Sequence, residues 1–261
     1  MNSLSIAATG MLAQQLNVEV ISNNIANMNT TGYKRQRAEF QDLLYQDLRR
    51  VGSTSSEAGT VVPSGVQIGL GVKPGAVYRI NQQGSITVTD NNFDLAVNGR
   101  GYFMVELPSG ETGYTRSGAF QLSANGDIVT ADGFVVQPGI TIPSNAVSVT
   151  INASGQVLVT LDNQVAVQQI GQLELANFPN DSGLEAIGNN LLLESPASGT
   201  PVVATPGSSG FGTLLQGALE TANVNVVSEI TNLIAAQRAY EMNSKVIQTS
   251  DEMMGATVQL R

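Results

Sequence analysis

The 261-residue sequence contains no cysteine, no histidine and no tryptophan. The absence of cysteine excludes disulfides, thiolate nucleophiles, zinc–thiolate sites and iron–sulfur ligation. The absence of histidine removes the commonest general base and metal ligand near pH 7. What remains is a carboxylate-only enzyme, a binding module or a structural protein, with no metal site or cofactor expected.

Charged residues and long apolar runs are also scarce. Only 13% of residues are charged, and the formal net charge of −9 argues against a nucleic-acid partner, which would need a basic surface. No stretch approaches the ~18 consecutive apolar residues of a membrane span, so no membrane insertion is expected. The first basic residue is Lys34, which predicts that the chain has no cleavable secretory signal. The hydrophobic fraction of 42% is nevertheless enough to bury a core.

The few basic residues are unevenly distributed. Five of the twelve lie within seventeen positions: Lys34, Arg35, Arg37, Arg49 and Arg50. Residues 117–237 contain no Lys or Arg and nine acids. One interpretation is a solvated basic loop whose charges pair locally with Glu39 and Asp42. The other is that Lys34, Arg35 and Arg37 contact acids on a second copy of the chain.

Apolar residues recur every seven positions at both ends of the chain. The first N-terminal series is Leu4, Met11, Val18 and Ile25, and the second contains Ala7, Gln14, Ile21 and Met28. The first C-terminal series is Val226, Leu233, Tyr240, Ile247 and Met254, and the second begins at Ile230 and is polar in its middle. The pattern predicts long helices, the second over 222–259 with Thr221 or Asn223 as its cap. We expect these residues to form a packing and assembly interface, because such stripes are too narrow for a globular core.

The middle of the chain has the alternation typical of β-strands. Val147, Val149 and Ile151 alternate with polar residues, and Asn-Gly, Asp-Gly and Ser-Gly turns punctuate the region. Short connections predict mainly antiparallel sheets. The predicted fold is therefore α+β: long, paired, coiled-coil-like terminal helices with an inserted β domain. The expected divisions are an N-terminal helix and turn (1–45), an extended linker (46–85), a β domain (86–194), a return linker (195–215) and a C-terminal helix (216–261) that pairs with 1–30.

Few motifs could carry chemistry. Asp90, Asn92 and Asp94 imitate the start of a calcium loop, but the glycine and the final glutamate of that loop are missing, which favours a polar turn. A glycoside hydrolase needs only a carboxylate pair, so it remains an alternative. Its candidate carboxylates are Glu106, Glu111, Asp127 and Asp132. The sequence has no tryptophan to stack on a sugar, which makes catalysis the weaker hypothesis.

Three stretches resemble the bacterial flagellar basal-body rod and hook proteins. Residues 22–35 (SNNIANMNTTGYKR) resemble the family's N-terminal signature, with Asn24, Asn27, Asn29, Gly32 and Tyr33. Residues 223–245 resemble its C-terminal signature, with Gln237, Arg238 and Tyr240. Residues 94–103 and 114–118 resemble the first strands of its β domain. The resemblance covers essentially the whole chain, and the length fits the distal rod members best.

The resemblance implies a structural subunit rather than an enzyme. Family members pack their terminal helices into a rigid helical tube that transmits torque from motor to hook and serves as an export conduit. It implies copies of the same chain, proximal rod proteins, hook protein and surrounding ring proteins as partners. It also implies a place in the periplasm-spanning rod, reached by type III export, and a bracing role for residues 48–66. The alternatives are a proximal rod or hook paralogue, or another self-assembling fibre subunit.

Overall fold

The computed structural model describes residues 2–49, 64–162 and 166–259. The chain forms two compact units, each discontinuous in sequence. Unit 1 comprises Met1–Ile25, Gln36–Tyr78 and Asn225–Arg261, and unit 2 comprises Ala26–Arg35 and Arg79–Val224. The chain therefore passes between the units four times, at residues 25/26, 35/36, 78/79 and 224/225.

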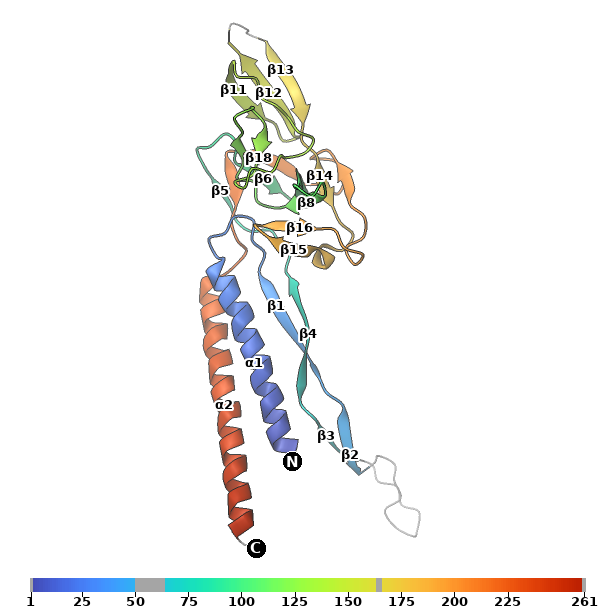
Figure 1. The fold of residues 1–261 in the computed structure, drawn as a ribbon, viewed down its shortest axis with the longest axis vertical. Coiled ribbons are helices and arrows are strands. Elements are labelled where there is room, and N and C mark those ends of the chain that lie inside the picture. The colour runs from blue at the N-terminus through green and yellow to red at the C-terminus, as the bar shows by residue number, and fades with distance from the viewer. Residues whose placement is uncertain (1, 50–63, 163–165, 260–261) are drawn as a thin grey trace. The chain divides into compact units, whose positions relative to one another are not determined.

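Unit 1 consists of two long helices and two narrow β-ribbons (Figure 1). The helices are α1 (Asn2–Ala26) and α2 (Val226–Gln259). The ribbons pair β1 (Gln36–Asp42) with β4 (Val72–Arg79), and β2 (Tyr45–Arg49) with β3 (Val66–Gly69). These two-stranded ribbons leave most of their side chains exposed.

The start of α2 differs from the prediction. The helix begins at Val226 rather than at residue 222, and its cap is Asn225, whose side-chain Oδ1 accepts a hydrogen bond from the backbone N–H of Ser228 at 3.1 Å. Thr221 and Asn223 do not cap it, because their side chains donate to carbonyls within unit 2. A side-chain oxygen facing the third residue of the helix is the usual N-cap geometry.

The prediction of coiled-coil-like paired helices is wrong. In the described part of the chain, the contacts between α1 and α2 include small and polar residues. Asn24 Nδ2 donates to Glu229 Oε2 at 3.2 Å, and Gly10 lies against the amide of Asn243. The residues of α2 that are buried are Glu229, Ala236 and Ser250. A coiled coil buries apolar residues of both heptad series, whereas Ile230, which begins the second series of α2, is 45% exposed.

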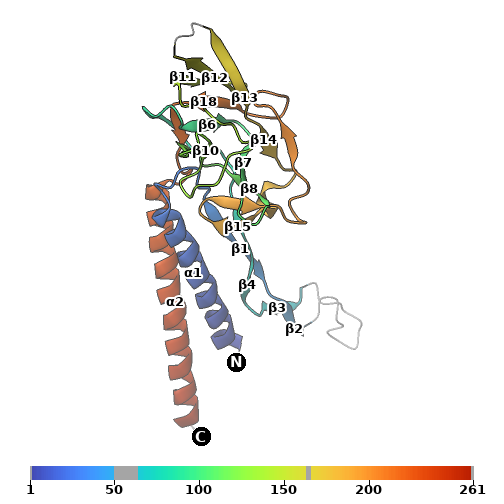
Figure 2. The same cartoon turned by 45° about the horizontal axis from the view of Figure 1, so that its top comes forward.

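Unit 2 is almost entirely β-structure. Its central sheet has six strands in the order β15-β16-β8-β7-β14-β17, formed by Glu185–Gly188, Leu191–Leu193, Thr112–Thr115, Tyr102–Glu106, Leu175–Asn177 and Val202–Ala204. A three-stranded sheet has the order β11-β12-β13, formed by Ala146–Ile151, Gln156–Leu161 and Val167–Gln172. Within unit 2, this sheet lies at one end, beside β6 and β18 (Figure 2).

Three strand pairs complete unit 2. They are β5 (Ile86–Val88) with β19 (Ala218–Glu220), β6 (Leu95–Asn98) with β18 (Thr213–Gln216), and β9 (Gln121–Leu122) with β10 (Ile128–Val129). Every pairing whose register is defined in unit 2 is antiparallel. A short 3₁₀ helix, η1 (Asp181–Gly183), follows β14. Antiparallel neighbours can be joined by tight hairpin turns, which is why short connections suffice.

The hydrophobic core of unit 2 has two parts. The larger cluster surrounds Phe103 and Phe120, whose rings meet edge to face at 5.0 Å between centroids. The smaller cluster places Tyr102 and Tyr114 against Phe178, again edge to face. Alternate residues of β7 thus face different clusters, as the two-residue repeat of a strand requires.

The predicted return linker is part of the sheet rather than a linker. Within 195–215, residues 202–204 form β17 and pair with β14, and Ser198 is buried. The Gly/Ser-rich stretch 52–65 and the predicted bracing segment 48–66 lie largely outside the described residues. The described part of the segment 46–85 contains most of β2, all of β3 and β4, and the residues that lead to β5.

Candidate functional site

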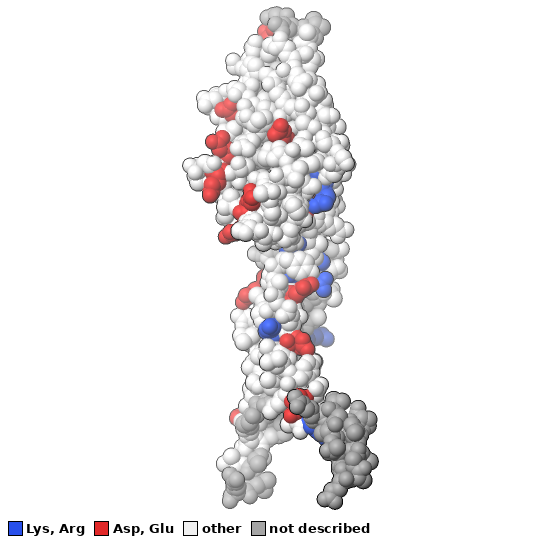
Figure 3. All heavy atoms as spheres, turned by 90° about the vertical axis from the view of Figure 1, so that its right-hand side faces the viewer, with Lys and Arg blue, Asp and Glu red and all other residues white. Residues whose placement is uncertain are grey.

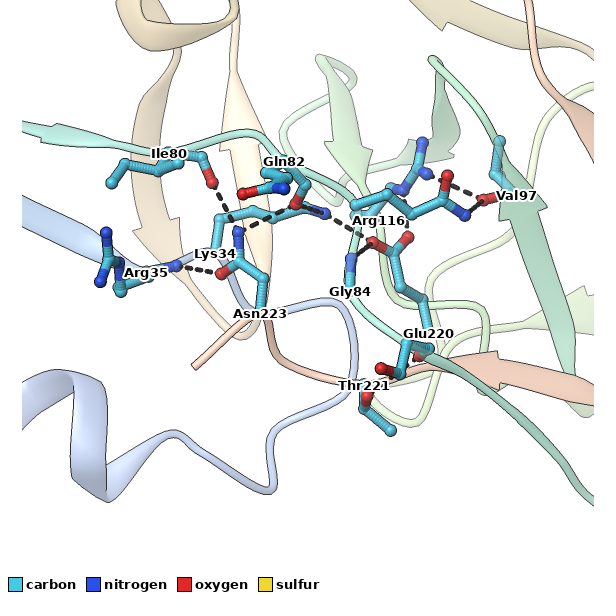
Figure 4. A network of polar contacts seen from close by, with 12 residues as sticks. Lys34, Arg35, Ile80, Gln82, Gly84, Val97, Arg116, Glu220, Thr221 and Asn223 are labelled. Atoms are coloured by element: carbon cyan, nitrogen blue, oxygen red, sulfur yellow. Dashed lines mark hydrogen bonds and ion pairs between the residues drawn. The ribbon is translucent and has the colours of Figure 1, made fainter. Parts of the chain in front are cut away.

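A buried polar network lies in unit 2, at the segments that lead to unit 1. It is formed by Gly32, Lys34, Arg35, Ile80, Gln82, Gly84, Arg116, Glu220 and Asn223, and we call this set the junction (Figure 4). All nine residues belong to unit 2. They come from the N-terminal segment, the approach to β5, the end of β8 and the end of β19.

Glu220 is the hub of the junction. Its side chain is only 1% exposed, and Lys34 and Arg116 converge on its carboxylate (Figure 4). Lys34 Nζ donates to Oε1 at 2.6 Å, and Arg116 Nε donates to Oε2 at 2.5 Å. The backbone N–H of Gly84 adds a bond to Oε1 at 2.8 Å. Two buried cations therefore share one buried carboxylate.

The pKa of each partner reflects this burial. Burial alone would raise the pKa of Glu220, but Arg116, Lys34 and the N–H of Gly84 together lower it, so the carboxyl is held ionised. Burial lowers the pKa of Lys34, while its bond to Glu220 acts in the opposite direction. A charge removed from water is tolerated only when it is paired and hydrogen-bonded, and both conditions are met here.

Arg116 ties Glu220 to the core of unit 2. Its guanidinium donates to the backbone carbonyls of Val97, Gly99 and Gly101, which lie at the end of β6 and the turn that follows. The planar fork of arginine suits such a multiple contact, which a lysine could not reproduce. The Tyr-Thr-Arg-Ser-Gly stretch singled out in the sequence therefore supplies the cation that anchors the junction.

Asn223 joins the other two crossing segments. Its Oδ1 accepts a hydrogen bond from the backbone N–H of Arg35 at 2.7 Å. Its Nδ2 donates to the carbonyls of Ile80 at 2.8 Å and of Gln82 at 2.9 Å. The backbone N–H of Ile80 in turn donates to the carbonyl of Arg35 at 2.8 Å. One amide side chain thus satisfies three backbone groups from two distant segments.

Two glycines permit the close approach of backbones in the junction. Gly32 has a φ of +70°, and its N–H donates to the carbonyl of Glu220 at 2.8 Å. A Cβ on Gly32 would lie 2.7 Å from the backbone nitrogen of Ser117. A Cβ on Gly84 would lie 1.9 Å from the carbonyl oxygen of Thr221. Only glycine fits either position without moving the chain.

The other signature residues divide into two groups. Asn24 is buried, donates to the carbonyl of Gln36 at 2.8 Å and accepts from the N–H of Gln36 at 2.8 Å, so it holds the end of α1 against the start of β1. Asn27 accepts from the hydroxyl of Thr30 in the turn that ends α1. The remaining polar signature residues Asn29, Gln237 and Arg238 are exposed, and Tyr33 is half-buried.

The predicted interface residues lie on both helices with mixed exposure. Ile21 is buried, and Leu4, Met11, Val18, Ile25, Val226, Leu233, Ile247 and Met254 are half-buried. Ile230 and Tyr240 are exposed, as are Val227, Ile234 and Met242 nearby. Large apolar side chains of α2 are thus exposed in the single chain. Their role as an assembly interface stays a prediction.

The three predicted intersubunit charges have different surroundings. Lys34 is buried against Glu220 in its own chain, so its charge is already paired. The side chain of Arg37 is exposed, and that of Arg35 is half-buried. The carboxylate of Glu39 accepts a hydrogen bond from the hydroxyl of Tyr78. Contacts to a second copy thus stay a prediction for Arg35 and Arg37.

The described residues offer little else for chemistry. Within 2–49, 64–162 and 166–259 no group of three or more acidic side chains is arranged to hold a metal ion. Both carboxylate oxygens of Asp94 accept hydrogen bonds, from Thr89 and Asn91, as in a polar turn. The four carboxylates considered for hydrolysis are exposed or half-buried. In the described part of the chain, neither helix is long and apolar enough to cross a membrane.

Sequence reasoning did not single out the hub. Glu220 stands outside both signatures, and a lone acid in an acidic stretch carries no signal of burial. Asn223 was assigned to the wrong task, as a helix cap. The signal in the sequence is the pair of motifs that carry Lys34 and Arg116, because a buried cation needs an acid as its partner. The sequence does not say which of the nine acids in residues 117–237 is that partner.

Three family models match the chain. The flagella basal body rod protein model matches residues 4–34, the flagellar hook protein FlgE/F/G D1 domain model matches residues 96–159, and the flagellar basal body rod FlgEFG protein C-terminal model matches residues 215–260. The matched ranges include the signatures recognised in the sequence. They also contain Lys34, Arg116 and Glu220 of the junction.

Curated relatives match over essentially their whole length. The flagellar basal-body rod protein FlgG of Caulobacter vibrioides is 63% identical over 261 residues, which is 100% of both chains. FlgG of Agrobacterium fabrum is 53% identical over 97% of each chain. The flagellar hook-basal body complex protein FlhP of Bacillus subtilis is 30% identical over 98% of this chain and 97% of the relative.

Proposed function

Because the chain belongs to the FlgG family of flagellar basal-body rod proteins, we propose that its copies assemble into a rigid helical tube, the distal rod. The chain is a structural subunit of the flagellar basal body and not an enzyme. It works within the basal body together with other rod and hook proteins. The observation that carries the proposal is the full-length identity of 63% to a rod protein.

Unit 1 supplies physical support for assembly. Large apolar side chains of α2 and of the ribbons are exposed in the single chain, among them Leu44, Leu48, Val227, Ile234, Met242 and Met253. A soluble monomer rarely exposes so many on a few elements, and such surfaces are typical of contacts with other chains. Two-stranded ribbons and single helices are also only marginally stable by themselves. Neighbouring copies of the chain would cover the exposed apolar side chains and stabilise the ribbons and helices.

The surface of unit 2 suits a shaft that turns inside a bushing. In the space-filling view, most residues are uncharged, and Asp and Glu occur in small separate groups (Figure 3). Charged residues make up only 13% of the chain, so long-range attraction to a surrounding ring would be weak. We propose as partners the surrounding ring proteins, the proximal rod proteins and the hook protein. The tube would transmit torque and serve as an export conduit across the periplasm.

The assembly can be tested on the exposed face of α2. Ile234→Asp should block polymerisation and motility while leaving the monomer folded, because the side chain is exposed in the single chain. A charge buried in an interface costs several kcal/mol unless it is paired. The matched control is Ile234→Val, which keeps the site apolar and should polymerise. Rods of normal length and abundance formed by Ile234→Asp, seen by electron microscopy, would contradict the proposal.

A proximal rod or hook paralogue is the second candidate, because one matching family model covers hook and rod proteins together. The identity to relatives named FlgG is 63% and 53%, whereas it is 30% to FlhP. This difference favours the distal rod. Complementation separates the two: the chain should restore motility to a strain that lacks FlgG and fail in strains that lack the paralogues.

A further inference from the structure

Three of the four crossings between the units lie next to the junction. Arg35 is the last residue before the crossing at 35/36, Ile80 comes just after the crossing at 78/79, and Asn223 comes just before the crossing at 224/225. These three residues are joined directly by the hydrogen bonds of the Asn223 side chain and by the Ile80–Arg35 backbone bond. The junction therefore gathers chain segments that are more than a hundred residues apart in sequence.

Each crossing leads at once into an element of unit 1. The ribbon strand β1 begins at Gln36, directly after Arg35, and β4 ends at Arg79, directly before Ile80. Helix α2 begins at Val226, shortly after Asn223. Whatever holds the junction together thus fixes one end of each of the three elements β1, β4 and α2.

The hydrogen bonds of the junction lie within unit 2. Glu220, Lys34 and Arg116 are buried, and the hydrogen-bond partners named for them above all belong to unit 2. Unit 2 also contains both hydrophobic clusters. Unit 1 has no comparable cluster among the described residues. Stability should therefore be uneven, with unit 2 as the region that opens only on global unfolding.

We propose that the junction is a preformed clamp, which holds the starts of β1 and α2 and the end of β4 together in the free subunit before a second copy binds. Glu220 and Asn223 are its positioning residues. Glu220 holds the N-terminal segment through Lys34 and the N–H of Gly32, and the approach to β5 through Gly84. Asn223 holds Arg35 and Ile80. Assembly then needs to order only the elements that extend from the clamp.

The test is amide exchange on the full chain at a concentration where sedimentation shows a monomer. The backbone N–H groups of Gly32, Arg35, Ile80 and Gly84 should be protected as strongly as those of β7, while the amides of α1 and α2 exchange at least about tenfold faster. Junction amides that exchange in the monomer as fast as those of an unfolded chain would overturn the proposal, because the clamp would then form only on assembly. This measurement needs no variant and does not depend on the rod function.

A pair of variants tests the positioning role. Asn223→Ala should accelerate exchange of the Arg35 and Ile80 amides at least about tenfold, since three hydrogen bonds are lost, and leave β7 unchanged. The matched control is Asn225→Ala, which removes the cap of α2 and should affect only the first turn of that helix. Unchanged exchange at Arg35 in Asn223→Ala, or an equal rise in β7, would refute the role.

Discussion

Replacing the hub by its neutral isostere should destabilise unit 2 strongly. Glu220→Gln keeps the shape of the side chain but removes the charge that both Lys34 and Arg116 contact. Two cations that are 9% and 8% exposed would then face each other without a counter-ion. Breaking a buried ion pair by removing one partner costs about 3–5 kcal/mol in the free energy of unfolding. We expect a loss of that size.

The same reasoning predicts a rescue. Taking only these three charges, the net charge of the cluster is +1 in the native chain, 0 in Lys34→Met, +2 in Glu220→Gln and +1 in the double variant. Two unit charges about 5 Å apart at an effective dielectric constant of about 20 repel by about 3 kcal/mol. Adding Lys34→Met to Glu220→Gln should therefore restore about 1–3 kcal/mol. Lys34→Met alone should cost less than Glu220→Gln, because Arg116 still pairs with Glu220.

Urea unfolding followed by near-ultraviolet circular dichroism would measure these differences. The signal would come from unit 2, because Tyr102 and Tyr114 pack against Phe178 in its smaller cluster. The four proteins form a double-mutant cycle, which isolates the interaction between the two sites. A double variant no more stable than Glu220→Gln, or a Glu220→Gln loss below about 1 kcal/mol, would refute the charge argument.

Three further predictions concern the junction and its surroundings. Gly84→Ala should open the junction and lower the unfolding midpoint, because the new Cβ would lie 1.9 Å from the carbonyl oxygen of Thr221. The contrasting variant is Gly255→Ala, whose new Cβ would have no atom within 4 Å, and it should stabilise α2 by about 1 kcal/mol. The pKa of Glu220 in the folded chain is lowered from 4.5, so its carboxylate stabilises the fold above pH 4.5. This stabilisation is lost as the pH falls through the folded-state pKa. In parallel unfolding titrations, the native chain should therefore lose stability in acid more steeply than Glu220→Gln. The double variant Arg35→Glu with Arg37→Glu should slow polymerisation at low salt and less so at high salt, as light scattering would show; equal rates for variant and native chain at both would leave only local roles for these charges.

Local patterns in the sequence were sufficient to place the helices. Seven-residue spacing predicted the two terminal helices, α1 and α2. Period-two alternation predicted strands such as β11 and β12. These features depend on the neighbours of each residue along the chain, so sequence alone carries them. The signatures were also sufficient to identify the family.

The pairing of segments that are far apart needed the tertiary structure. Heptad spacing suggested a coiled coil, yet α1 and α2 meet through Asn24, Gly10 and their polar partners, because spacing says which residues share a face and not what covers it. The linker composition of 195–215 hid β17, whose strand forms only against β14. Composition cannot show that a Gly- and Pro-rich segment finds a sheet edge.

The spacing of its residues by itself predicted two terminal helices with strands between them, and the resemblance of its signatures to a known family predicted a structural subunit. Only the tertiary structure decided that Glu220 is the residue that Lys34 and Arg116 share, and that Asn223 closes the junction rather than capping a helix. The reason is physical. Burial and charge pairing depend on which distant segments meet in space, and one acid among nine in an acidic stretch looks like the others until the fold removes it from water.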